Sequence, residues 1–154
     1  MKSIKKSEEI LVIRNKKNSM RMINKIIIHC SATKPTQDIG AAEIDMWHKK
    51  QGWDEIGYHF VIRRNGEIEK GRPLEIAGAH CKGQNKNSIG ICLAGGIDEN
   101  GRAENNFTEK QFQSLRNLAA KLKKEYPNAA IHGHNEFANK ACPCFDVKEF
   151  FNEK

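Results

Sequence analysis

The sequence lacks a long apolar segment. No apolar run approaches the roughly 20 residues that a membrane-spanning helix needs, and the apolar run that follows the first lysines covers only residues 10–13. A secretory signal needs an apolar stretch of roughly 7–15 residues and then a small-residue cleavage site. Because neither is present, we expect a chain that is made in the cytoplasm without a secretory leader.

The main part of the chain also lacks an excess of charge. The formal net charge of the 154-residue chain is +7, but residues 1–25 alone hold eight basic and two acidic side chains, which leaves 18 basic and 17 acidic ones elsewhere. A basic tail can touch nucleic acid or an anionic surface, whereas a nearly neutral body predicts no stable nucleic-acid binding. We interpret residues 1–22 as a basic, disordered extension and residues 23–154 as one domain, long enough to bury a core.

Several cysteine and histidine motifs are absent. The five cysteines are odd in number and form no C-x-x-C pair, so a disulfide framework is not expected. The absence of H-E-x-x-H argues against a helix-borne metalloprotease. His134-Asn135-Glu136 has the H-x-E form of nucleobase deaminases, but those enzymes also need P-C-x-x-C, which this chain lacks. A disulfide between Cys142 and Cys144, two residues apart, would be strained, so we expect Cys144 to be an inert thiol.

The apolar pattern predicts strands that alternate with helices. Residues 25–29 are apolar on both faces, which suits a central strand, and Asn65-Gly66 between two strand-like runs predicts a hairpin. Thr108 and Gln111 have the spacing of a capping box at the start of a helix. We therefore predict an α/β single domain with a central mixed β-sheet flanked by helices. The expected strands are 25–29, 58–63, a segment at 68, 88–93 and 129–131, and the expected helices are 41–51, 108–126 and 146–151.

Two predicted strands end close to metal-ligating residue types. His29 ends the first strand, and His134 follows the last one, with Cys142 eight positions further on. If these strands are neighbours, two imidazoles and one thiolate meet at one edge of the sheet. Three protein ligands leave the fourth position of a zinc ion open, as in catalytic zinc sites. Each residue taken alone also fits a plainer role, a bonded polar histidine or a small buried cysteine.

Six short motifs around these residues occur in a fixed order. Together they closely resemble the phage T7 lysozyme type of N-acetylmuramoyl-L-alanine amidase, within the zinc amidase and peptidoglycan-recognition-protein superfamily. The resemblance runs from about residue 23 to residue 151. The motifs are His29-Cys30-Ser31-Ala32-Thr33, Gln51-Gly52-Trp53, Gly57-Tyr58-His59-Phe60, Asn87-Ser88-Ile89-Gly90, Gly95-Gly96-Ile97-Asp98 and Lys140-Ala141-Cys142-Pro143.

The resemblance implies a zinc ion and a hydrolysis. It implies Zn²⁺ held by His29, His134 and Cys142, where the eight-residue distance to the cysteine favours His134 over His132. It further implies that Tyr58 and Lys140 are catalytic. The amide bond between the lactyl group of N-acetylmuramic acid and L-alanine in peptidoglycan would then be cut, as by an endolysin. His80 would lie in a loop that lines the substrate groove and is a candidate substrate-binding residue.

Other expectations concern partners and neighbouring residues. A rival hypothesis is a recognition domain that holds muropeptides without cutting them, but such domains typically lack the cysteine ligand. Some phage relatives bind their own RNA polymerase, and by resemblance only this is a possible partner. We expect a monomer that reaches the wall after release or export through a separate membrane pore. Trp47 and Trp53 are interpreted as core residues, His59 as a core or supporting residue, and the direction of Glu136 is left open.

Overall fold

A computed structural model describes residues 21–152 of the chain. The predicted extension at residues 1–22 therefore lies, except for Arg21 and Met22, outside the described residues. Arg21 is bound to the domain, because its guanidinium donates to the carbonyl oxygens of Leu74 at 3.0 Å and Asn85 at 3.0 Å. Within the described part of the chain, no helix has the length and apolar character to cross a membrane.

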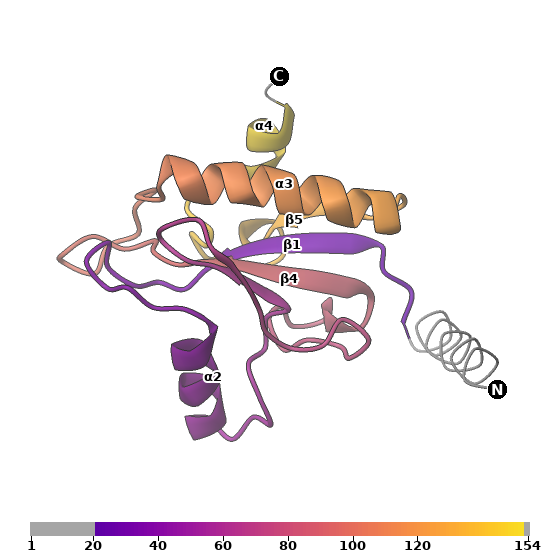
Figure 1. Ribbon diagram of the computed structural model, residues 1–154, viewed down its shortest axis with the longest axis horizontal. Helices are drawn as coiled ribbons and strands as arrows, with labels where there is room; N and C mark the ends of the chain where they lie inside the picture. Colours follow the sequence, from indigo (N-terminus) through magenta and orange to yellow (C-terminus); the bar gives the residue numbers. More distant parts are fainter. Residues whose placement is uncertain (1–20, 153–154) are drawn as a thin grey trace, which may run out of the picture.

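A five-stranded mixed sheet forms the centre of the domain (Figure 1). Strand order is β3-β2-β4-β1-β5, and only the β2–β3 pair is antiparallel. The predicted α/β class with a central mixed sheet is confirmed. The strands are β1 (Lys25–Cys30), β2 (Phe60–Ile62), β3 (Ile68–Lys70), β4 (Ser88–Leu93) and β5 (Ala130–Gly133).

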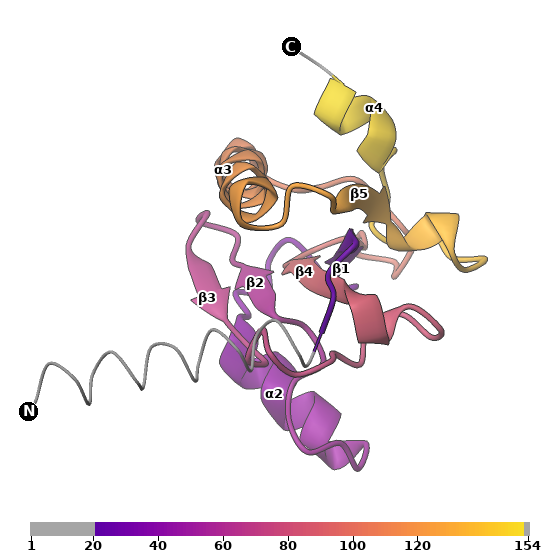
Figure 2. The same ribbon diagram turned by 90° about the vertical axis from the view of Figure 1, so that its right-hand side faces the viewer.

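Helices cover both faces of the sheet, which explains why β1 is apolar on both faces. Helix α3 (Glu109–Glu125) lies on one side and α2 (Ala41–Lys50) on the other (Figure 1 and Figure 2). Ile26 and Ile28 of β1 pack in the cluster that includes Leu115 of α3, whereas Ile44 of α2 belongs to a second cluster. Each fully buried aliphatic side chain contributes about 1.5–3 kcal/mol. The short α4 (Val147–Asn152) follows near β5.

The start of α3 is fixed to the sheet by one glutamine. The predicted capping box is confirmed, since the Thr108 hydroxyl accepts from the Gln111 backbone at 3.1 Å and the Gln111 side chain accepts from the Thr108 backbone at 3.0 Å. The same Gln111 amide donates to the carbonyl oxygens of Ile62 at 3.1 Å and Ala94 at 2.8 Å. A fully buried side chain thus joins the cap to β2 and to the end of β4.

The loops between these elements contain two 3-10 turns that the apolar pattern did not predict. They are η1 (Asn85–Asn87), directly before β4, and η2 (His134–Glu136), directly after β5. The η2 turn starts at His134, so this histidine directly follows β5 and lies at the edge of the sheet without an intervening loop.

Candidate metal centre

Parallel pairing brings the two histidines together. Strands β1 and β5 are parallel neighbours with Ile28 opposite Gly133, so the next residue of each chain segment, His29 and His134, lies at the same edge of the sheet. Their ring centroids are 4.6 Å apart. The sequence-based expectation that neighbouring strands would place both imidazoles at one edge is met.

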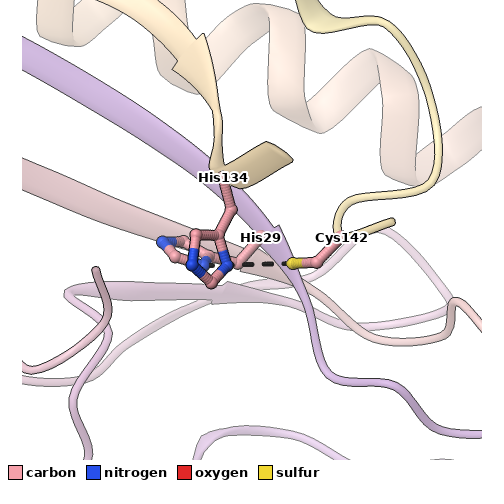
Figure 3. Close-up of side chains that lie close together, drawn as sticks. All are labelled: His29, His134 and Cys142. Atoms are coloured by element: carbon pink, nitrogen blue, oxygen red, sulfur yellow. Dashed lines mark hydrogen bonds between the residues drawn. The ribbon is translucent and has the colours of Figure 1, made fainter. Parts of the chain in front are cut away.

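Cys142 completes the group from a loop (Figure 3). Its sulfur lies 4.0 Å from Nδ1 of His29. One ligand atom from each of His29, His134 and Cys142 lies within 4.8 Å of the others, and in residues 21–152 this is the one group of three or more such side chains gathered in this way. Figure 3 shows the three side chains converging from β1, from the end of β5 and from the loop.

The surroundings suit a cation held by neutral imidazoles and a thiolate. Burial, and then the nearby His80, holds the pKa of His29 well below its usual value, and burial followed by the Lys140 charge lowers the pKa of His134. Both rings are therefore neutral at pH 7 and keep a lone pair for a metal. The backbone N–H of Cys30 donates to the Cys142 sulfur at 3.2 Å, which stabilises a thiolate. Two nitrogens and one sulfur form a ligand set that suits zinc.

A groove opens beside these ligands. The cavity has a volume of about 580 Å³, and its wall includes both His134 and the Tyr58 and Lys140 side chains expected to be catalytic. The ring centroid of Tyr58 lies 5.1 Å from that of His29. Burial raises the pKa of Tyr58 well above its usual value, so its hydroxyl stays protonated and can donate a hydrogen bond. The remaining wall includes His48, Trp53, His80, Lys82, Phe137 and Ala138.

Two residues of this wall were not expected there. Trp53 was interpreted as a core residue, and this is wrong: it is 38% exposed and lines the groove, because the Gly52 turn after α2 carries the ring out of the core. His48 packs between Trp53 and Tyr58, with ring centroids at 4.4 and 5.6 Å, and its Nδ1 accepts from the Gly57 backbone at 2.9 Å. Trp47 packs against the core, as expected.

Glu136 turns away from the groove. Its carboxylate accepts from the Gly133 backbone at 2.6 Å and lies 2.9 Å from Nδ1 of His132. The open question of its direction is thereby answered: it caps the η2 turn at the end of β5. His132 is therefore bonded to Glu136 and is not one of the three candidate metal ligands, whose second histidine is His134.

Cys144 and His59 are not members of the metal-ligand group and bond to the backbone around it. The Cys144 thiol donates to the Gly96 carbonyl at 3.3 Å and its sulfur lies 4.0 Å from that of Cys30. His59 is buried, with Nδ1 accepting from the Gly90 backbone at 3.0 Å and Nε2 2.9 Å from the Ile76 carbonyl. His59 is thus a buried residue of the core, as expected, whereas the inertness of the Cys144 thiol stays a prediction.

A second cavity of similar size, about 620 Å³, lies between α3 and α4. Its wall includes three phenylalanines, three carboxylates, two side-chain amides and Arg116, which stacks at 4.0 Å on Phe150. Its lining contains neither histidine nor cysteine, so the group of candidate metal ligands lies at the groove beside His29 and not at this second cavity.

Known proteins are similar to this chain in sequence and in architecture. A family model described as N-acetylmuramoyl-L-alanine amidase matches residues 18–145. The endolysin of Escherichia phage T7 is 52% identical over 128 residues, which are 83% of this chain and 85% of that protein. The N-acetylmuramoyl-L-alanine amidase LysC from Clostridium intestinale URNW has a TM-score of 0.74 at 31% identity, covering 87% of this chain and 88% of that one. Wild-type Drosophila PGRP-LB has a TM-score of 0.67 at 26% identity, over 80% and 75% of the two chains.

Proposed function

The chain belongs to the N-acetylmuramoyl-L-alanine amidase family, and from this we propose that His29, His134 and Cys142 hold the catalytic zinc ion of a peptidoglycan amidase. The resemblance found in six sequence motifs is confirmed, and the enzyme is an amidase of the endolysin type. Its reaction is hydrolysis of the amide bond between the lactyl group of N-acetylmuramic acid and L-alanine.

The convergence of the three ligand atoms beside an open groove is the observation that supports the zinc proposal most strongly. A bound zinc ion with three protein ligands supplies a Lewis acid that polarises the scissile carbonyl and lowers the pKa of water. The chain itself contributes the neutral rings of His29 and His134, and the Cys30 N–H that supports the sulfur of Cys142.

Lys140 and Tyr58 are proposed to act on the oxygen of the scissile carbonyl. Attack by water turns this carbonyl into a tetrahedral oxyanion, and both side chains line the groove in which it would form. The Lys140 ammonium offers a full positive charge, and the Tyr58 hydroxyl is kept protonated by burial. One well-placed donor of this kind is worth about 2.7–4 kcal/mol in the transition state.

Trp53 and His80, which line the groove together with Lys140, are proposed to bind the peptide stem. Trp53 offers an exposed aromatic surface, and His80 lies deeper in the same wall. Both ring nitrogens of His80 already have protein partners, at 2.8 Å in His29 and 3.1 Å in Ser88. His80 would therefore meet a substrate through ring carbons, as part of the shape of the groove.

The substrate proposed for this groove is the peptidoglycan of the bacterial cell wall, on which the related phage endolysins act. We propose that the enzyme works as a monomer and reaches the wall through a separate membrane pore. Binding of a phage RNA polymerase stays a prediction that rests on resemblance alone.

Mass spectrometry of muropeptides after digestion tests the proposed function. We expect free stem peptides that begin with L-alanine, and glycan strands that keep the intact lactyl group. Chelation should stop their release, and added zinc should restore it. New reducing sugar ends would instead mean a glycosidase, and tight binding without any release would mean a recognition domain.

A further inference from the structure

The ring of His29 is engaged on both of its nitrogens. Nδ1 faces the sulfur of Cys142 at 4.0 Å, on the side of the proposed metal. Nε2 lies 2.8 Å from Nδ1 of His80, whose own Nε2 lies 3.1 Å from the Ser88 hydroxyl. A line of contacts thus runs from the metal ligand through the irregular loop before η1 to the first residue of β4.

The proposed metal fixes the direction of every hydrogen bond along this line. A nitrogen that binds a metal has no proton, so a neutral His29 with Nδ1 on the metal carries its proton on Nε2. That N–H donates to His80, whose Nδ1 must therefore be the acceptor. The His80 proton is then on Nε2 and is donated to the hydroxyl oxygen of Ser88. One tautomer of each ring satisfies all the contacts.

The fold holds His80 rigidly in this place. Both its backbone N–H and that of Cys81 donate to the side-chain oxygen of Asn85, each at 2.9 Å. The imidazole rests on Gly90 of β4, where an added Cβ would lie 2.7 Å from ring carbons. Its ring meets the His29 ring edge-on, with an interplanar angle of 88°. A side chain that only lined the groove would not need this support on both nitrogens and on its face.

We propose that His80 is a positioning residue, which, backed by Ser88, fixes the tautomer and the ring orientation of His29 for the metal. The proposal rests on the proposed zinc function. Partners of this kind on the far nitrogen of a ligating histidine typically change metal affinity or activity by about 10–100-fold when they are removed.

Two replacements of similar size test the contacts of the two His80 ring nitrogens independently. His80→Asn places an amide oxygen near the position of Nδ1, so it can still accept from His29. His80→Gln places its amide near the position of Nε2, so it reaches Ser88 but offers nothing to His29. Zinc affinity is measured by competition with a chromogenic chelator, and the His29 tautomer by long-range proton–nitrogen NMR of the zinc-loaded protein.

We expect His80→Gln to weaken zinc binding by about 10–100-fold and to lose the protected Nε2–H signal of His29. His80→Asn should keep that signal and bind zinc nearly as tightly as the wild type. Lys86→Gln, an exposed change two residues before Ser88, is the control and should leave both readouts unchanged.

The outcomes distinguish this proposal from the one on which it rests. A wild-type protein that binds no zinc would defeat the proposed function itself. A wild type that binds zinc, together with a His80→Gln variant of equal affinity and unchanged His29 signal, would overturn the positioning role alone. If His80→Gln does not fold, Ser88→Ala decides the question, because it changes neither ring: we expect exchange broadening of the His29 Nε2–H signal, and an unchanged signal contradicts the proposal.

Discussion

The backbone N–H of Cys30 points at the sulfur of Cys142 from 3.2 Å, across 112 positions of the sequence. Cys30 directly follows His29, so the end of one strand supplies both a proposed metal ligand and the hydrogen bond that supports a second proposed ligand. The two ligands are therefore coupled through the backbone of β1, and a loss of the sulfur should disturb more than one coordination position.

Replacing Cys142 tests that coupling. We expect Cys142→Ser to lose most of its zinc and its amidase activity, because a serine hydroxyl is a far weaker zinc ligand than a thiolate. Zinc content by atomic emission and turnover on peptidoglycan are the measurements. Cys144→Ser is the matched control and should keep both, since that thiol faces Cys30 and Gly96. The reverse pattern would assign the ligand to Cys144.

Removing the groove lysine should separate binding from chemistry. Lys140→Ala is expected to keep its zinc but lose about 10²–10³-fold in kcat, because the positive charge facing the oxyanion is gone. Metal content and kcat are measured on the same preparation. Lys82→Ala removes another lysine from the same wall; an equal loss there would attribute the effect to the general charge of the groove.

The hydroxyl of Tyr58 can be removed without changing the ring. We expect Tyr58→Phe to retain zinc and to keep its packing against His29, and to lose at least about tenfold in kcat with a smaller change in KM. Steady-state kinetics on a soluble muropeptide give both constants. Wild-type kcat in this variant would exclude the hydroxyl from transition-state stabilisation.

His59 should make the domain less stable in acid. Burial lowers the pKa of His59 to about 4, whereas an exposed histidine has a value near 6.5. As the pH falls from 6.5 towards 4, the unfolded chain takes up a proton that the folded chain refuses, so the free energy of unfolding decreases by up to about 3 kcal/mol. Urea unfolding of the metal-free protein at several pH values measures this.

His59→Asn provides the comparison for that measurement. The amide oxygen can still accept from Gly90 but does not titrate, so the variant should show a shallower decrease below pH 6.5. Other histidines whose pKa is lowered, such as His80 with a pKa of about 3, keep part of the slope in both proteins. Identical slopes in wild type and variant would show that His59 takes up its proton at the same pH in the folded and in the unfolded protein.

Gln111 should be important for stability and not for chemistry. Gln111→Leu removes the two hydrogen bonds to Ile62 and Ala94 and half of the capping box, so we expect a loss of about 2–3 kcal/mol in the free energy of unfolding. Thr108→Ala, which removes the other half of the cap and the hydrogen bond from the Thr108 hydroxyl to the Arg64 carbonyl, should cost about 1 kcal/mol. Chemical denaturation measures both, and equal losses would mean that the bonds to the sheet contribute nothing.

The parts of this enzyme that follow from regular patterns could be predicted. The apolar run of β1, the Asn65-Gly66 hairpin and the Thr108 cap each depend on local chemistry, so the mixed sheet and its helices were predicted with small shifts at the ends. Placing His29 beside His134 needed one further assumption, that two parallel strands are neighbours, and the register of Ile28 with Gly133 confirms it.

The contacts that support the site could not be predicted in the same way. His80 lies in a loop without periodicity, and its approach to His29 depends on how residues 71–87 cross β4. The exposed position of Trp53 depends on a turn in which Gly52 has a φ of 96°. The direction of the Glu136 side chain depends on the 3-10 turn η2, which the sequence pattern did not predict. Each depends on tertiary geometry, which a run of residue types does not contain.

Gly90 is a position at which a substitution that looks harmless would damage this enzyme. Its φ lies outside the left-handed region, so a survey that swaps glycines for alanines to rigidify the backbone would select it as harmless. Yet the first methyl group at this position would collide with the imidazole of His80 and push it off His29. The proposed metal centre thus depends on a residue that has no side chain at all.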